Sequence, residues 1–226
     1  MVTGVQRKRK SSVSYTLTEL TTRLGPMPSW RIRTNPPPGS ATPADVLRIH
    51  RAEHRLCELS DGILVEKDLG YEESVIAGRL LTFLNNFVIP RRLGLVTGEA
   101  GMMKINSRTV RIPDVAFVSV QRLPAGAMPT EAMPRLVPNL AVEVLSRGNT
   151  VEEMQTKRMD YFLAGVELMW VVDPRSRTVE VWTSQNSSVT LKDSQFLTGG
   201  SVLPGDRKST RLNSSHSSVS RMPSSA

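Results

Sequence analysis

The chain has 226 residues, of which 39% are hydrophobic, 29 are basic and 21 are acidic, so its formal net charge is +8. The excess of positive charge lies at the two ends. Residues 1–43 hold seven basic residues and one acid, residues 206–226 hold four and one, and residues 44–205 keep 18 basic residues and 19 acids. The high overall charge is therefore no evidence that the central part binds nucleic acid.

Cysteine content and hydropathy exclude two further classes of protein. Cys57 is the single cysteine, so an intramolecular disulfide is impossible and a reducing compartment is natural. No apolar run approaches the roughly 18 residues that a membrane helix needs, and no signal core follows the basic N-terminus. We expect a cytoplasmic protein that does not enter a membrane.

The two ends read differently from the centre. Residues 1–43 carry the basic run Arg7-Lys8-Arg9-Lys10 and a proline cluster with little apolar periodicity, which indicates a flexible basic leader. That run is either an electrostatic arm for nucleic acid or a solvated extension. From Asp206 onward the sequence reads as the translation of a standard sequencing adapter, so we expect residues 206–226 to be an artefact and disordered. One domain over residues 44–205 remains.

The first half of this domain predicts a helix, a hairpin, a second helix and two short strands. The evidence is apolar residues at helical spacing, strand-length apolar runs and turn residues such as Asp61-Gly62. In order, the expected elements are a helix over 44–50, a hairpin over 56–67, a helix over 74–88, and strands over 93–97 and 102–105.

The second half predicts two acidic strands separated by a proline-rich loop, and then a helix and a strand pair. The helix has a start signal at Asn149-Thr150. In order, the expected elements are a strand over 111–118, a loop over 124–138, a strand over 140–146, a helix over 150–165, and strands over 166–172 and 178–183. Together the elements predict a mixed α/β domain.

Asp114 and Glu143 lie inside those apolar strands, where a carboxylate is desolvated unless a cation or a hydrogen-bond donor compensates it. One or two carboxylates with retained waters commonly hold magnesium in phosphoryl-transfer sites. The pattern therefore predicts that the two acids lie side by side and share a divalent ion. Without the ion they would repel, which would raise the pKa of at least one. The structural alternative is an ion pair with Arg111 or Arg147.

Five motifs in fixed order resemble the Uma family of proposed endonucleases, which belongs to the PD-(D/E)XK restriction-endonuclease-like superfamily. They are Asp61-Gly-Ile-Leu-Val-Glu-Lys67, Pro113-Asp-Val-Ala-Phe-Val118, Val142-Glu-Val-Leu-Ser146, Lys157 with Tyr161-Phe162, and Trp170-Val-Val-Asp-Pro174. The resemblance covers residues 44–205 and implies a restriction-endonuclease-like core, that is, a mixed β-sheet flanked by helices. It also implies a further segment after Gly205, so that the true C-terminus is truncated.

The resemblance implies that Asp114 and Glu143 bind Mg²⁺ or Mn²⁺, with the main-chain carbonyl of Val144 as a further ligand. The superfamily usually places a lysine two residues after the glutamate, where this chain has Leu145. Lys157 on the following helix is the candidate substitute, and a solvated helix charge is its alternative reading.

A further acid often joins this superfamily's site from the first helix. Glu73 is the candidate here, although Glu72 stands beside it. The alternative is that these acids complement the helix dipole.

The expected function is that of a divalent-metal-dependent endodeoxyribonuclease, a hydrolase of DNA phosphodiester bonds, for which a homodimer is one assembly to test. Leu145 at the usual lysine position and the near-neutral centre favour the alternative, a non-catalytic nucleic-acid-binding or protein-interaction module on the same fold.

Overall fold

The computed structural model describes residues 15–192 and 194–209. Its largest unit is a six-stranded sheet in the order β10-β9-β8-β7-β6-β3, in which only β7 and β8 run parallel. Its strands are β3 (Gly94–Thr97), β6 (Val115–Ser119), β7 (Leu140–Val144), β8 (Leu168–Asp173), β9 (Thr178–Ser184) and β10 (Ser187–Lys192). A parallel pair needs a crossover, and here the crossover is α4 (Val151–Ala164).

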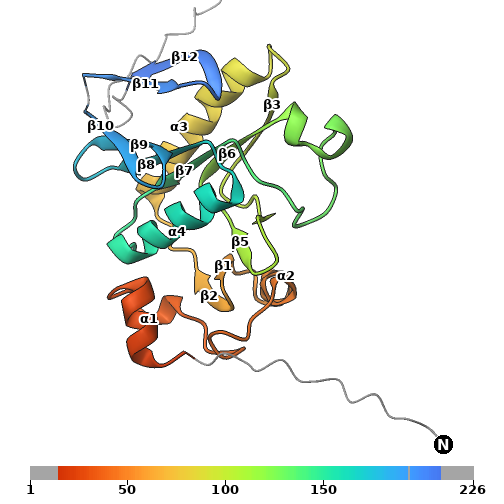
Figure 1. Ribbon diagram of the computed structural model, residues 1–226, viewed down its shortest axis with the longest axis vertical. Coiled ribbons are helices and arrows are strands. Elements are labelled where there is room, and N and C mark those ends of the chain that lie inside the picture. The colour runs from red at the N-terminus through yellow and green to blue at the C-terminus, as the bar shows by residue number, and fades with distance from the viewer. Residues whose placement is uncertain (1–14, 193, 210–226) are drawn as a thin grey trace, which may run out of the picture.

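Two helices cover the two faces of this sheet, α4 in front and α3 (Tyr71–Val88) behind it (Figure 1). Side chains alternate between the faces along each strand. One set of alternate residues, which includes Val115, Val142 and Trp170, packs with α3. Ala141 belongs to the other set and packs with Tyr161 of α4. Glu143 follows the alternation of Ala141 and therefore faces α4.

A second sheet, in the order β2-β1-β5-β4, lies below the first in the view of Figure 1. Its strands are β1 (Cys57–Ser60), β2 (Ile63–Glu66), β4 (Met103–Lys104) and β5 (Thr109–Arg111). Helix α2 (Pro43–Glu53) covers it through Val46 and Ile49. The chain passes from β5 through residues 112–114 into β6, so Asp114 lies where the two sheets meet.

The turn between β1 and β2 depends on a glycine. Asp61 and Gly62 both have positive φ, at 51° and 86°, which is the conformation of a tight hairpin turn. A Cβ on Gly62 would lie 2.4 Å from the carbonyl oxygen of Gly39. The turn is therefore packed directly against the backbone of the N-terminal segment.

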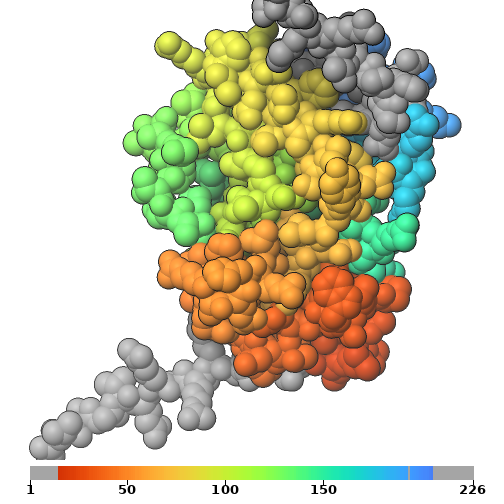
Figure 2. Space-filling model, turned by 180° about the vertical axis from the view of Figure 1, so that it is seen from behind, coloured from red at the N-terminus to blue at the C-terminus, as the bar shows by residue number. Residues whose placement is uncertain are grey.

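The expectation of a flexible leader over residues 1–43 is wrong for residues 15–43. Thr16 and Glu19 form a reciprocal capping box that starts α1 (Leu17–Leu24), and a short 3₁₀ helix follows at Ser29–Arg31. The apolar side chains of this segment are buried against β2; they are Leu20, Leu24 and Met27, which pack on Ile63 and Val65. Seen from behind, the segment forms the lower part of one continuous surface (Figure 2). The basic run at residues 7–10 lies outside the described residues.

The C-terminal part adds a two-stranded sheet of β11 (Phe196–Gly199) and β12 (Leu203–Ser209). Leu197 and Leu203 are fully buried in the core that α3 covers. The backbone of residues 207–209 is paired in β12, which contradicts the expected disorder there. Residues 210–226 lie outside the described part of the chain.

The expected elements between residues 44 and 183 are present, with ends that differ by a few residues. The expected 111–118 strand is two strands, β5 and β6, because Pro113 interrupts the pairing. Among the described residues, no helix is both long and apolar enough to cross a membrane.

Candidate functional site

Asp114 and Glu143 lie opposite each other on neighbouring strands. Val115 of β6 pairs with Val142 of β7 in an antiparallel register, so the preceding residue, Asp114, faces Glu143 one step along the ladder. Residues opposed in this way point to the same face of a sheet. The structure thus places the two carboxylates side by side, at the end of the strands and beneath α4.

Each of the two acids is bound by a lysine. Nζ of Lys67, just after β2, donates to Oδ1 of Asp114 at 2.7 Å and to the carbonyl oxygen of Ile112 at 2.7 Å. The other oxygen of Asp114 accepts the backbone N–H of Val144 at 2.7 Å. Both oxygens of Asp114 are therefore engaged by donors within the chain.

Glu143 is held by two residues of α4. Nζ of Lys157 donates to Oε2 at 2.9 Å, and the hydroxyl of Tyr161 donates to Oε1 at 2.7 Å. These residues are four apart and so share one face of the helix. The side chain of Lys157 is only 4% exposed, so its reading as a solvated helix charge is wrong.

The pKa of Glu143 is raised, first because it is buried and then because Glu58 and Asp114 repel its charge, while Lys157 acts in the opposite direction. This agrees with the expectation that neighbouring acids raise the pKa of at least one. Burial alone would lower the pKa of Lys157, but Glu143 and Glu58 raise it well above its ordinary value. Lys157 therefore stays a cation at neutral pH.

Glu58 of β1 is a third buried acid in the same place. It contacts Lys157 at 3.1 Å and Arg111 at 3.0 Å, and accepts the backbone N–H of Ile112 at 2.9 Å. Burial alone would raise its pKa, but Lys157 and Arg111 lower it to about 2. Arg111 also binds Asp160 of α4. We call this group the buried charge cluster; its members are Glu58, Lys67, Arg111, Asp114, Glu143, Lys157 and Asp160.

The structural alternative predicted the wrong partners. Arg111 binds Glu58 and Asp160, not Asp114 or Glu143. Among the described residues, Arg147 forms no ion pair with either acid, and the actual partners are Lys67 and Lys157. Sequence reasoning missed Glu58 and Lys67 as site residues, although both lie within the predicted hairpin over 56–67 and Glu58 stands in an apolar run.

Glu73 is in the first turn of α3, half-buried, with its carboxylate against Gly70, the residue that precedes the helix. Glu72 beside it is exposed. This is the position in which an acid complements the helix dipole. Leu145 packs at the edge of the core under α4. The structure thus joins Asp114, Glu143, Lys157 and the backbone of Val144, and within the described part of the chain no hydrogen bond or ion pair links Glu73 to them.

A divalent ion would have to share or displace hydrogen bonds that the two carboxylates already accept, from Lys67 and Val144 at Asp114 and from Lys157 and Tyr161 at Glu143. Asp114 and Glu143 offer hard carboxylate oxygens on one face, the type that Mg²⁺ and Mn²⁺ prefer. Four carboxyl groups stand against three cations in the cluster, so the carboxyl groups outnumber the cations by one. Across residues 15–192 and 194–209, no three His, Cys, Asp or Glu side chains gather closely enough to hold a metal by themselves.

Comparison with known proteins identifies the family and the fold. Residues 43–211 match the family described as "Uma2: Putative restriction endonuclease". The chain belongs to this family. A solved structure of a "putative nuclease belonging to DUF820 from Anabaena variabilis ATCC 29413" is similar, with a TM-score of 0.63 and 18% identity over 70% of this chain and 88% of that chain. The fold is therefore restriction-endonuclease-like. No curated protein matches the chain.

The Uma2 match begins at residue 43, yet a residue before it helps to hold the site together. The guanidinium of Arg31 donates to the backbone carbonyls of Glu66 at 2.9 Å and Gly148 at 2.7 Å. It also binds both carboxylate oxygens of Glu153, at 2.9 and 2.8 Å. Arg31 thereby joins three segments to one another: the end of β2 just before Lys67, the loop after Glu143, and helix α4, which carries Lys157.

Proposed function

We propose that this Uma2 member is a DNA endonuclease that hydrolyses phosphodiester bonds with Mg²⁺ or Mn²⁺. The observation that carries the proposal is the opposition of Asp114 and Glu143 across β6 and β7, with Lys157 bound to Glu143. Family and fold support a nuclease of the restriction-endonuclease type. The single cysteine favours the cytoplasm as the compartment.

Asp114 and Glu143 would hold the metal, with the carbonyl of Val144 as a further ligand. A metal bound there would supply a Lewis acid and an activated water for attack on phosphorus. Lys157 would remain protonated, because the neighbouring acids raise its pKa. Its role would therefore be to stabilise the negative charge that develops on the phosphate, and not to accept a proton.

Lys67 bears on the second candidate function. For a metal to reach Oδ1 of Asp114, the ammonium of Lys67 has to release that oxygen, to which it donates at 2.7 Å. If this ion pair persists, Asp114 is structural and the chain is a non-catalytic nucleic-acid-binding or protein-interaction module. The two candidates differ in whether metal displaces Lys67.

The test is cleavage of plasmid and single-stranded DNA by the full chain with Mg²⁺ or Mn²⁺. Asp114→Asn and Glu143→Gln should lower the rate about 100-fold or more, because each removes a ligand of the ion. The exposed acid Glu131 supplies the control, and Glu131→Gln should cleave like the wild type.

Thermal melts of the same proteins with and without Mn²⁺ report on the metal directly, because a ligand that binds only the folded state raises the melting temperature. The wild type should respond and Asp114→Asn should not. A wild type that neither cleaves DNA nor responds to metal would leave the non-catalytic module as the answer.

A further inference from the structure

A pocket of about 270 Å³ opens beside the buried charge cluster, between α4 and the strands β8 and β9. Its lining includes Leu145, Ser146, Arg158, Val171, Glu180 and Trp182. We propose that this pocket binds a backbone phosphate of the nucleic-acid strand, next to the phosphate that is cleaved. The proposal rests on the proposed function for its substrate, and it is tested separately below.

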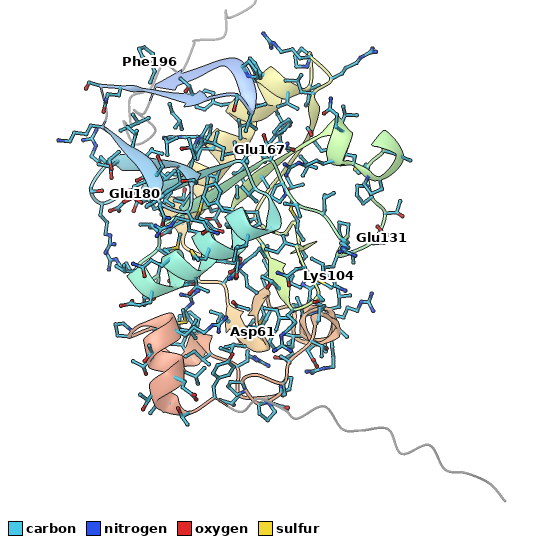
Figure 3. The ribbon with its side chains drawn as sticks, in the orientation of Figure 1. Asp61, Lys104, Glu131, Glu167, Glu180 and Phe196 are labelled. Atoms are coloured by element: carbon cyan, nitrogen blue, oxygen red, sulfur yellow. The ribbon has the colours of Figure 1, made fainter. Side chains whose placement is uncertain are left out.

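Strand register places the pocket next to Glu143. Glu143 pairs with Val171 of β8, and Val171 pairs with Glu180 of β9, so the three side chains form one row on the face beneath α4. Figure 3 labels Glu180 on β9, above α4 in that view. Neighbouring strands lie about 4.8 Å apart, so the pocket floor begins roughly one strand spacing from Glu143. A strand held at Asp114 and Glu143 can therefore reach it.

The pocket has an arginine that stacks on a ring and has one unpaired hydrogen-bond donor among the described residues. The guanidinium carbon of Arg158 lies over the ring of Trp182, 3.8 Å from its centre. Its Nε is buried, and no hydrogen bond to it occurs among the described residues. Stacking restrains the planar guanidinium beside the pocket. A guanidinium donates in pairs to the oxygens of a phosphate.

The other charged groups also favour an anion. Arg175 lines the pocket and is largely exposed, with Nε 3.7 Å from Oδ1 of Asp173. The one lining acid, Glu180, already accepts the indole N–H of Trp182 at 2.9 Å. Among the lining residues, two arginines stand against one carboxylate that is already engaged, while Asp173, the partner of Arg175, does not line the pocket.

The contacts of Trp182 indicate that the pocket reads the backbone and not the base. A base would bind most strongly by stacking on an aromatic face. Arg158 covers one face of the Trp182 ring, and the ring also packs on the core beneath α4. Binding there should therefore be independent of base sequence, as phosphate contacts are.

The experiment measures binding of a fluorescent single strand of about 12 nucleotides without divalent metal, between about 50 and 200 mM salt. Arg158→Gln and Arg175→Gln should each weaken binding several-fold and reduce the slope of log K against log salt by roughly 0.7, because each removes one phosphate contact. For each variant, the affinity should fall by the same factor with two DNA strands of different sequence.

Arg91 provides a matched control, because its guanidinium also stacks on a ring, 4.1 Å from the centre of Phe87, but it does not line the pocket. Arg91→Gln should bind like the wild type. Arg175 is exposed, so Arg175→Gln should fold normally. It therefore tests the proposal even if Arg158→Gln does not fold.

Unchanged affinity and slope in both pocket variants, or no binding of the strand by the wild type, would overturn the proposal. If the wild type cleaves DNA while the pocket variants bind normally, the phosphate site fails and the proposed function stands. If the pocket variants lose binding while the wild type cleaves nothing, the phosphate site stands and the nuclease assignment fails.

Discussion

Arg31 and Glu153 form a bidentate ion pair, with N–O distances of 2.8 and 2.9 Å and side chains that are 3% and 4% exposed. The pair joins the N-terminal segment, which lies outside the Uma2 match, to the helix that carries Lys157 and Tyr161. A charge buried this deeply is tolerated only when its partners are in place. The N-terminal segment is therefore part of the architecture that supports the site.

Arg31→Met should lower the free energy of unfolding by about 3–5 kcal/mol, because it leaves the carboxylate of Glu153 buried without its cation. Urea unfolding measures the loss. Arg48→Met is the control, since Arg48 is 51% exposed and pairs with Asp45 at 3.3 Å. Breaking that exposed pair should cost less than about 1 kcal/mol. Similar losses in the two variants would show that burial of the Arg31 pair contributes little.

Asp114→Asn should destabilise the metal-free protein by roughly 3 kcal/mol, because it leaves the ammonium of Lys67 buried without its carboxylate. Sequence reasoning alone, which saw two repelling acids, would predict the opposite sign. The double variant Lys67→Met with Asp114→Asn removes both charges and should recover much of the loss. Chemical denaturation without metal decides this. A single variant as stable as the wild type would mean that Lys67 finds another partner.

Glu58 and Glu143 should affect acid stability in opposite directions. The pKa of Glu58 is lowered from 4.5 to about 2, so its stabilising contribution is complete above about pH 4.5 and is lost as the pH falls toward 2. The pKa of Glu143 is raised, so its folded form holds a proton more tightly, and stability falls as the pH rises from 4.5 through its folded pKa.

Urea unfolding from about pH 2 to 7 should therefore show a deficit for Glu58→Gln that is largest above pH 4.5 and shrinks in acid. Glu143→Gln should show a deficit that grows as the pH falls toward 4.5. The exposed Glu131→Gln supplies the baseline. Parallel pH profiles for all three variants would contradict the assigned pKa shifts.

Gly62→Ala should destabilise more than Gly165→Ala. Both glycines have positive φ, at 86° and 102°, so each substitution carries backbone strain of about 1 kcal/mol. A Cβ at residue 62 would also lie 2.4 Å from the carbonyl oxygen of Gly39, whereas one at residue 165 meets nothing within 4 Å. Melting temperatures of the two variants make the comparison. Equal shifts in melting temperature would mean that the backbone at Gly39 moves away from the added Cβ at little energetic cost.

Local signals predicted most of the central domain. The Asp61-Gly62 turn, the start signal at Thr150 and the apolar runs around Asp114 and Glu143 each act over a few residues, and each element is present. Thr150 indeed accepts the N–H of Glu153 at 3.1 Å. The same apolar runs predicted that the two acids lie side by side. Each carboxylate in such a run needs a compensating cation, and one shared ion would serve both.

Long-range contacts explain what was missed. The Thr16-x-x-Glu19 capping box was a readable helix signal, but only contact with Ile63 and Val65 makes the following helix part of the core. The ion pairs of Arg31 and Lys67 join residues 122 and 47 apart in the chain. No pattern within one segment specifies such partners, so sequence reasoning treated Lys67 as a strand end and Arg31 as part of a leader.

The wide separation of Arg31 from Glu153 also has a consequence for synthesis on the ribosome. Arg31 emerges 122 residues before its partner, a delay on the order of ten seconds at usual elongation rates. The parallel pairing of β7 requires β8 as well, which ends at Asp173. Until then Glu143 has no finished sheet to enter, and α1 has no partner helix until α4 is complete at Ala164. The nascent chain should therefore acquire its site only after residue 173 is made, and in a chain arrested before that residue the segment around Arg31 should be more sensitive to proteases than in the full chain.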